Sequence, residues 1–436
     1  MTLTAMPKYD TYKNSGVEWL GDIPEHWHVI RLKNAALINP ISDISKVHLD
    51  DEICFLPMEK VGTDGTVEYD LRRSLRRVKQ GFTSFQVNDV LIAKITPCFE
   101  NGKGAYLKNM PTKFGYGSTE FHVLRAYENF EPAFLYYLSK SHGFMDLGEK
   151  MMTGSAGQKR VPTDFIAEFR FASPSFVEQK IIANFLDQKT TQIDEAIAIK
   201  EQQIALLNER KQILIQQAVT QGLDPNVPMK DSGVAWIGTI PAHWGIKRAK
   251  YLFNEINERS INGDEELLSV SHITGVTPRS EKNVNMFMAE DYSGSKTCKK
   301  NDLVINIMWA WMGALGVSDR EGIVSPSYGV FREKTQNTFN PVFLEHLLKS
   351  KSYIEHYNQV STGLHSSRLR FYGHMFFDME MGFPSFEEQN SIIEYIQKES
   401  KNIDKALVLQ EQQITMLKEY KTTLINSAVT GKIKVV

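Results

Sequence analysis

Two clusters of acidic and basic residues have the spacing of a magnesium-dependent nuclease site. Asp194 precedes Glu209-Arg-Lys211 in one part of the chain, and Asp404 precedes Glu419-Tyr-Lys421 in another. This loose D…ExK pattern supports DNA cleavage only where the carboxylates converge on one ion. Both clusters lie in segments with helical periodicity, and residues fifteen apart on a helix are separated by ~22 Å. We therefore interpret them as helix residues that do not form a nuclease site.

No other pattern indicates catalysis or metal binding. The sequence has no GxxxxGK[ST] phosphate loop and no HExxH motif. Residues 340–343, Asn-Pro-Val-Phe, lack the second proline of the Asn-Pro-Pro-aromatic signature of amino-methyltransferases. Cys54, Cys98 and Cys298 are far apart and match neither a disulfide framework nor a zinc site. We expect no catalytic residue, metal or cofactor in this chain.

Two segments in the first half combine side chains that suit contact with DNA. Residues 72–79 contain five basic side chains and no acid, and such clusters neutralise phosphates. A solvated protein surface explains this run equally well. Residues 154–160 combine glycines, which allow close backbone approach, with Gln and Arg side chains that can contact base edges in bidentate fashion. Lys94, Thr96 and Lys103 form a further candidate loop.

Counterparts of these loops occur in the second half of the chain with different residues. This difference is expected if each half of the chain recognises a different half of one DNA site. Residues 363–370 correspond to the Gly-rich loop, and the stretch that starts at Asn306 corresponds to the loop at Lys94. We interpret Trp309 and Trp311 in that stretch as core residues. The candidate DNA contacts are Arg72, Arg73, Arg76, Arg77, Lys94, Thr96, Lys103, Ser155, Gln158, Lys159, Arg160, Asn306, His365, Ser366, Ser367, Arg368 and Arg370.

The chain repeats itself in a circular order. The segment SGVEWLGDIPEHW, residues 15–27, returns as SGVAWIGTIPAHW at 232–244, and PSFVEQ at 174–179 returns as PSFEEQ at 384–389. Each half therefore runs from a GVxW block through a variable region to a PSF block and a helical segment. We interpret the tryptophans and histidines of these blocks as packing anchors: Trp19, Trp27, Trp236, Trp244, His26 and His243.

A long helix is predicted after each PSF block. Ser175 with Glu178, and Ser385 with Glu388, have capping-box spacing, while Gly222 and Gly431 stand where C-terminal caps belong. Apolar residues then recur in steps that add up to a heptad seam, and the simplest arrangement pairs the two helices antiparallel. The alternative is that each helix packs only on its own domain. The predicted pairing residues are Ile193, Ile197, Ile204, Leu207, Leu214, Ile403, Leu407, Ile414, Leu417 and Leu424.

The variable regions read as mixed α/β (α+β) domains. Strand-like runs at 90–93 and 121–124 precede a predicted helix over 132–141 and a Gly-rich loop at 153–157. Taken with the repeat, the fold class is two pseudo-twofold-related α/β recognition domains separated by two long helices that form an antiparallel coiled coil. The predicted boundaries are 1–174, first recognition domain; 175–222, first helix region; 223–384, second recognition domain; and 385–436, second helix region.

Composition permits several classes of function. The 436 residues carry a formal net charge of −2, which neither requires nor excludes DNA binding. A scaffold that binds only proteins, holding two copies of a partner, therefore remains an alternative. The polar N-terminus lacks the apolar stretch of a signal peptide, and we expect a cytoplasmic protein without membrane contact.

On the paired GVxW and PSF blocks and the AVT endings at 218–220 and 428–430, the chain resembles the specificity subunit of type I restriction-modification systems. The resemblance covers essentially the whole chain. It implies two target-recognition domains that each read one half of a bipartite double-stranded DNA site. It also implies two modification subunits, which use S-adenosylmethionine, and ATP- and Mg-dependent restriction subunits; the specificity subunit itself is not an enzyme.

Overall fold

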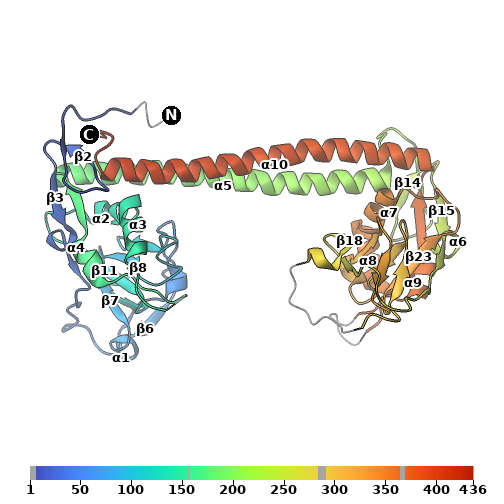
Figure 1. Ribbon diagram of the computed structural model, residues 1–436, viewed down its shortest axis with the longest axis horizontal. Coiled ribbons are helices and arrows are strands. Elements are labelled where there is room, and N and C mark those ends of the chain that lie inside the picture. Colours follow the sequence, from blue (N-terminus) through green and yellow to red (C-terminus); the bar gives the residue numbers. More distant parts are fainter. Residues whose placement is uncertain (1–5, 156, 283–290, 364–368, 436) are drawn as a thin grey trace. The chain divides into compact units, whose positions relative to one another are not determined.

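The computed structural model describes residues 6–155, 157–282, 291–363 and 369–435. The chain divides into two compact units. The first unit comprises Met1–Glu201 and Glu411–Val436, and the second comprises Gln202–Gln410. Each unit thus contains one recognition region and a part of both long helices (Figure 1).

Two four-stranded sheets form the body of the first unit. One has the order β4 (Ala36–Ile38), β11 (Phe121–Ala126), β8 (Val90–Ala93), β9 (Gly104–Tyr106), with antiparallel pairing throughout. The other has the order β6 (Arg72–Ser74), β5 (Glu52–Leu56), β10 (Phe114–Gly117), β7 (Thr83–Gln86), in which β5 and β10 are parallel. The strands predicted at 90–93 and 121–124 are confirmed as β8 and β11.

Helices and short strands complete the first unit. The helix predicted over 132–141 is α2 (Pro132–Leu138), which ends at its C-cap Ser139 and is followed by a second helix. Buried apolar side chains from both sheets, among them Leu56, Phe85 and Leu91, form one core. The remaining elements are β1 (Tyr12–Asn14), β2 (Asp22–Pro24), β3 (His28–Arg31), η2 (Leu32–Asn34), η3 (Met58–Lys60), α1 (Leu75–Val78), α3 (His142–Lys150), α4 (Thr163–Glu168) and β12 (Arg170–Ser173).

The second unit repeats the antiparallel four-stranded sheet of the first, while its other strands form two-stranded sheets. Its central sheet runs β16 (Phe253–Glu255), β23 (Gly329–Glu333), β20 (Leu303–Ile305), β21 (Leu315–Val317), again all antiparallel. The other elements are β13 (Met229–Asp231), β14 (Thr239–Pro241), β15 (Gly245–Arg248), α6 (Ala249–Leu252), β17 (Leu268–Ser271), β18 (Gly275–Pro278), η4 (Arg279–Glu281), β19 (Lys296–Cys298), η5 (Ala310–Met312), β22 (Gly322–Val324), α7 (Pro341–Leu348), α8 (Lys351–Val360), α9 (Gly373–Asp378) and β24 (Glu380–Phe383).

One buried ion pair recurs at the same place in both central sheets. Asn88 and Asn301 adopt φ angles of 70° and 73° in the turns that lead into β8 and β20. The next residue, Asp89 or Asp302, is 0% or 1% exposed and accepts two hydrogen bonds from an arginine of the neighbouring strand. The left-handed turn suits asparagine, and the arginine offsets the cost of the buried carboxylate.

The long helices α5 (Phe176–Gln221) and α10 (Phe386–Val429) begin and end where the sequence predicts. The backbone N–H groups of Glu178 and Glu388 each donate to the serine hydroxyl three residues earlier, at 3.3 Å. At the other ends, Gly222 and Gly431 have φ angles of 77° and 73°. These left-handed glycines terminate the helices, because residues with a Cβ are strained in that conformation.

Within each unit the parts of α5 and α10 run antiparallel. In the first unit the start of α5 and the end of α10 both meet Trp27, and further along Asp194 pairs with Lys421 at 2.6 Å. In the second, the start of α10 meets Trp244 beside Gly222, and Lys211 pairs with Asp404 at 2.7 Å. All ten predicted pairing residues are buried or half-buried. Within the described residues, none of the helices combines the length and apolar character of a membrane span.

Candidate nucleic-acid interface

The repeated blocks form a joint between each recognition region and a long helix. In the first unit the Glu178 carboxylate accepts hydrogen bonds from Trp27 Nε1 at 3.1 Å and from the Tyr9 hydroxyl at 2.7 Å, and it contacts His26 Nε2 at 3.1 Å. Trp27 is completely buried. The prediction that Trp27 is a packing anchor is thereby confirmed. The same prediction is wrong for the histidines of the two blocks, because the His26 and His243 side chains are 57% and 51% exposed.

The second unit builds the same joint with fewer contacts. Glu388 accepts from Trp244 Nε1 at 3.1 Å and meets His243 Nε2 at 2.8 Å. Its side chain is 30% exposed, against 7% for Glu178. Trp19 stacks on Phe169, and Trp236 stacks on His356, so the remaining tryptophans of these blocks are also packing residues.

The glutamine of each PSF block fixes the recognition region to the helix. Gln179 accepts a hydrogen bond from the backbone N–H of Glu131, the N-cap of α2, at 2.9 Å. Gln389 accepts one from Asn340, the N-cap of α7, at 2.8 Å. These amides satisfy donors that a helix leaves unpaired at its start. The repeated motif therefore links α2 and α7 of the recognition regions to the starts of the long helices.

The two ends of the chain meet in the first unit, as the circular repeat predicts. The backbone N–H of Lys434 donates to Pro7 O at 2.7 Å, and the Tyr12 hydroxyl donates to Gly431 O at 3.1 Å. Lys432 Nζ donates to Leu20 O at 2.8 Å. The GVxW block at the N-terminus thus follows the end of α10 in space, as the second GVxW block follows α5 along the chain.

The structure brings together two of the predicted loops of the first unit. The segment after β8 and the Gly-rich loop pair through Thr96 N to Lys159 O at 3.0 Å and Val161 N to Lys94 O at 2.8 Å. The Lys159 N–H also donates to the Thr96 hydroxyl at 3.1 Å. We call this pair of segments, residues 94–96 and 153–161, the first loop pair.

Most polar side chains of the first loop pair are exposed to solvent, but the charge of Arg160 is partly neutralised. Ser155, Gln158 and Lys159 are exposed. Arg160 forms a bidentate ion pair with Glu120, both N–O distances being 2.9 Å, and this guanidinium lowers the pKa of the Glu120 carboxyl. Glu120 holds Arg160 in a fixed orientation, a role that the sequence did not suggest because the two residues are forty positions apart.

Three other candidates of the first unit, Arg73, Arg76 and Lys103, have partners within the protein. Arg76 forms a bidentate ion pair with Asp50, and the guanidinium of Arg73 lies 4.3 Å from the centroid of the Phe55 ring. Lys103 Nζ donates to a backbone carbonyl, Met58 O, at 3.0 Å. Arg72 is half-buried, whereas Arg77 is exposed. The basic run is therefore less positive than its sequence indicated.

A matching second loop pair exists in the second unit. Phe371 N donates to Ile307 O at 2.9 Å, the counterpart of the Val161–Lys94 bond, and Thr362 and Arg370 exchange backbone hydrogen bonds of 3.1 and 2.9 Å. The candidates His365, Ser366, Ser367 and Arg368 lie outside the described residues. Arg370 is half-buried and donates to Leu369 O.

Two interpretations of the stretch at 306–312 need correction. Asn306 is 4% exposed, and its amide donates to the Tyr328 hydroxyl at 2.9 Å, so we do not retain it as a base-reading residue. The interpretation of Trp309 as a core residue is wrong, because it is 47% exposed. Trp311 is half-buried and stacks against it with ring centroids 5.9 Å apart.

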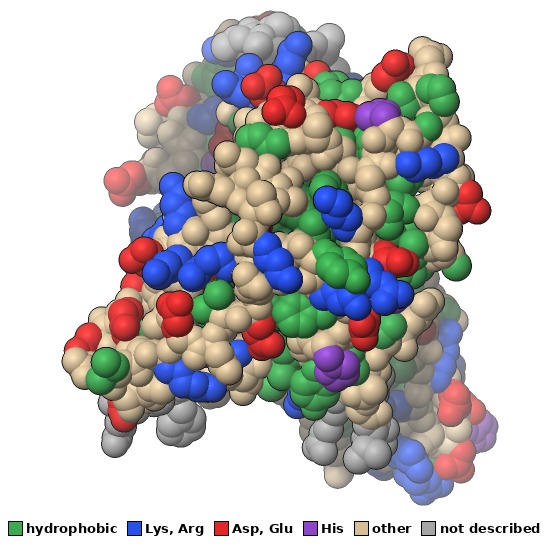
Figure 2. All heavy atoms as spheres, turned by 90° about the vertical axis from the view of Figure 1, so that its right-hand side faces the viewer, with side chains coloured by type: hydrophobic (Ala, Val, Ile, Leu, Met, Phe, Trp, Pro, Cys, Tyr) green, Lys and Arg blue, Asp and Glu red, His purple; other side chains and the backbone are tan. Residues whose placement is uncertain are grey.

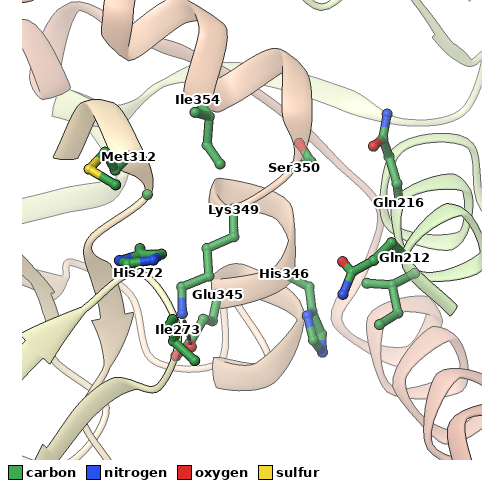
Figure 3. A pocket seen from close by; sticks show the side chains of 12 residues that line it. Gln212, Gln216, His272, Ile273, Met312, Glu345, His346, Lys349, Ser350 and Ile354 are labelled. Carbon is green, nitrogen blue, oxygen red and sulfur yellow. Dashed lines mark hydrogen bonds and ion pairs between the residues drawn. The ribbon is translucent and has the colours of Figure 1, made fainter. Parts of the chain in front are cut away.

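Each unit has a hollow between its recognition region and a long helix. In the second unit it measures about 320 Å³, and Figure 3 shows Gln212 of α5 pointing toward His346 of α7. Lys349 forms an ion pair there with Glu345 at 2.8 Å, and burial lowers the pKa of His346. The Glu345 carboxylate also accepts from Val317 N. These charges hold neighbouring elements in place.

The hollow of the first unit, about 560 Å³, lies at the matching place. Lys140 donates there to Thr63 O at 3.2 Å and to Gly102 O, and burial lowers its pKa to about 8. Asp194 and Lys421, which pair with each other, line the same hollow. Among the described residues, no group of three or more His, Cys, Asp or Glu side chains could hold a metal ion.

The nuclease-like clusters are explained by pairing between the helices. The aspartate of each cluster binds the lysine of the other: Asp194 with Lys421, and Asp404 with Lys211. The interpretation of these residues as helix residues is therefore confirmed.

On the face shown in Figure 2, basic side chains are interspersed with acidic and hydrophobic ones, so overall charge does not mark a binding surface there.

Comparison with known proteins gives consistent similarities. A family model described as the type I restriction modification DNA specificity domain matches residues 74–209. The EcoAI specificity subunit of Escherichia coli is 36% identical over 196 residues, which are 44% of this chain and 32% of that relative. The chain thus matches about a third of the relative's length.

Two solved structures share the fold. One, described as the structural basis of complex assembly and conformational transition of the type I R-M system, matches with a TM-score of 0.69 and 16% identity, covering 93% of this chain and 98% of that one. The other is the HsdS subunit from Thermoanaerobacter tengcongensis, with a TM-score of 0.55 and 15% identity over 94% and 98% of the two chains.

Proposed function

We propose that this chain, which belongs to the type I restriction-modification specificity family, reads a bipartite DNA site and directs partner enzymes to it. The observation that carries the proposal is the recurrence of one loop pair. Two backbone connections recur in both units. Val161 N donates to Lys94 O as Phe371 N donates to Ile307 O, and Thr153 exchanges hydrogen bonds with Arg160 as Thr362 does with Arg370. The side chains of the two loop pairs differ. Equivalent loops with different chemistry suit two half-sites of different sequence.

The recognition domains in this proposal are residues 1–174 and 223–384, and the helix regions are 175–222 and 385–436. The helices hold the recognition domains apart as an antiparallel coiled coil, with half-site centres about one helical turn, ~34 Å, apart. Inserting one heptad in both helices adds ~10 Å. The preferred spacer should then lengthen by about three base pairs, at 3.4 Å per step.

The helices also offer a seat for two copies of a modification partner. A second apolar stripe lies on their exposed sides, outside the seam: Ile199, Leu206 and Ile213 in α5 at heptad spacing, and Leu409 and Met416 in α10. Leu409 and Met416 are the repeat counterparts of Ile199 and Leu206. A stripe that recurs in both halves suits two identical subunits, because a twofold-related partner needs the same surface twice.

Catalysis belongs to the partners in this proposal. Modification subunits supply S-adenosylmethionine-dependent methylation of adenine, and restriction subunits supply ATP- and Mg-dependent translocation and cleavage. This chain contributes DNA contacts and protein contacts in the cytoplasm and binds no cofactor of its own.

The test is co-expression with the modification partner, followed by genome-wide mapping of methylated adenines. A split motif is expected, and exchanging residues 28–173 for those of a relative should change one half of the motif only. Methylation that ignores this exchange would contradict the proposal. A complex whose DNA affinity does not fall with salt would favour a scaffold that binds only proteins, since phosphate contacts release counterions.

A further inference from the structure

Trp309 presents an indole ring to solvent from the second loop pair. All six tryptophans lie within the described residues; Trp309 alone is exposed, at 47%. The other five are buried or half-buried in the contacts described above. Leaving an indole in water forgoes a large apolar burial, so the fold gives no reason for a tryptophan here.

The segment that carries Trp309 is held firmly. Trp311 Nε1 donates to Met308 O at 3.0 Å, and Asn358 Nδ2 donates to Trp311 O at 2.9 Å. The Asn306 side chain accepts from Met308 N at 3.2 Å from inside the protein. Trp311 supports the Trp309 ring from one side, with the planes 26° apart. A rigid, half-supported aromatic ring loses little conformational entropy when it binds a partner.

The repeat places Trp309 where the first unit has Thr96. Ile307 and Lys94 make the same backbone bond to the neighbouring loop, and Trp309 and Thr96 each stand two residues later. Thr96 is in direct contact with Lys159 of the Gly-rich loop. The backbone N–H of Trp309 itself donates to Asn306 O at 3.0 Å. By its position in the repeat, two residues after Ile307, Trp309 therefore stands next to the loop that the proposed function assigns to base reading.

We propose that Trp309 is a specificity-determining residue of the second recognition domain that presses its ring face against an apolar base surface. This inference rests on the proposed function. In a duplex the apolar surface is either the methyl group of thymine in the major groove or a base face exposed at a kinked step. A polar side chain gains no hydrogen bond from either surface, whereas an indole ring can pack against both.

The experiment compares full complexes carrying Trp309→Ala, Trp309→Phe or the control Tyr251→Ala, which removes another exposed aromatic ring of the same unit, 65% exposed. Binding is measured with the mapped site and with a duplex in which the second half-site is scrambled. We expect Trp309→Ala to weaken binding to the mapped site about 5- to 100-fold. Binding to the scrambled duplex should not change, Trp309→Phe should retain most of the affinity, and Tyr251→Ala should match the wild type.

A second arm replaces each thymine of the second half-site by uracil. A loss of affinity in the wild-type complex that is absent in Trp309→Ala identifies the methyl group as the contact. No loss at any thymine, with the alanine effect retained, identifies a base face.

The inference is overturned if Trp309→Ala binds like the wild type, or weakens binding to both duplexes equally. It is also overturned if the variant fails to assemble with its partners while Trp309→Phe assembles, because the ring would then be a protein contact. A wild-type complex that does not distinguish the two duplexes would refute the proposed function itself.

Discussion

Replacing Glu178 by alanine should destabilise the first unit more than the matching change at Glu388 destabilises the second. Both carboxylates accept a hydrogen bond from a buried tryptophan, and both meet a histidine. Only Glu178 also accepts from the Tyr9 hydroxyl, and its side chain is 7% exposed against 30% for Glu388.

The expected magnitudes follow from these contacts. A hydrogen bond to a charged group contributes about 1.5–3 kcal/mol, and a buried donor left without an acceptor costs about 1–3 kcal/mol. Glu178→Ala strands two buried donors, so we expect a loss of about 3–5 kcal/mol. Glu388→Ala strands one, and water can reach the gap, so about 1–2 kcal/mol is expected. Glu178→Gln keeps an uncharged acceptor, so its loss of stability should lie between the losses expected for Glu178→Ala and Glu388→Ala.

Hydrogen exchange followed by mass spectrometry measures this difference in the full chain without assuming two-state unfolding. Peptides around Trp27 should lose about 100-fold or more of their protection in Glu178→Ala, since 1.4 kcal/mol corresponds to a factor of ten. Peptides around Trp244 should lose about 10-fold in Glu388→Ala. The control is Glu201→Ala, an exposed site on α5, which should change neither region. Equal losses at the two joints would refute the reasoning from burial.

Three other perturbations have defined outcomes. Burial lowers the folded-state pKa of Lys140 to about 8, so the unfolded chain binds more protons between about pH 8 and 10.5 and the free energy of unfolding rises with pH there. Lys140→Met should abolish that rise, which is at most about 3 kcal/mol. Urea titrations of the wild type and the variant at pH 7.5 and 10 measure it, and a rise that is unchanged in the variant would contradict the assignment to Lys140. Arg332→Met leaves its buried aspartate partner unpaired and should cost about 3–5 kcal/mol in the same assay, a cost below 1 kcal/mol being incompatible with that burial. A double-mutant cycle on Asp194 and Lys421 should give a coupling free energy of only about 0.3–1 kcal/mol, because the aspartate side chain is 46% exposed. Asp194→Ala should also leave DNA cleavage by the assembled complex intact. Loss of cleavage in a complex that assembles normally would support the nuclease interpretation instead.

Much of the fold could be predicted from short-range patterns. The capping serines, the terminal glycines and the heptad seam located both long helices almost to the residue. The paired blocks predicted the circular repeat, and the contact between Lys434 and Pro7 agrees with it. Each of these signals depends on residues that are close in sequence or on copies of the same segment.

The candidate site was predicted less well, because its properties depend on distant partners. The sequence marked Arg76 and Arg160 as candidate DNA contacts, but both form ion pairs within the protein, with Asp50 and Glu120. It marked Trp309 as a core residue, whereas its ring is half exposed. In each case the side chain's type was known and its environment was not.

The sequence by itself determined where the helices begin and end and that the chain is built twice. Caps, heptads and repeats are local or self-similar, so they can be read without coordinates. Only the tertiary structure decided which polar and aromatic groups remain available to a partner. Lys211 and Asp404 are 193 residues apart, and folding alone brings their charges within 2.7 Å and converts a nuclease-like pattern into a link between helices.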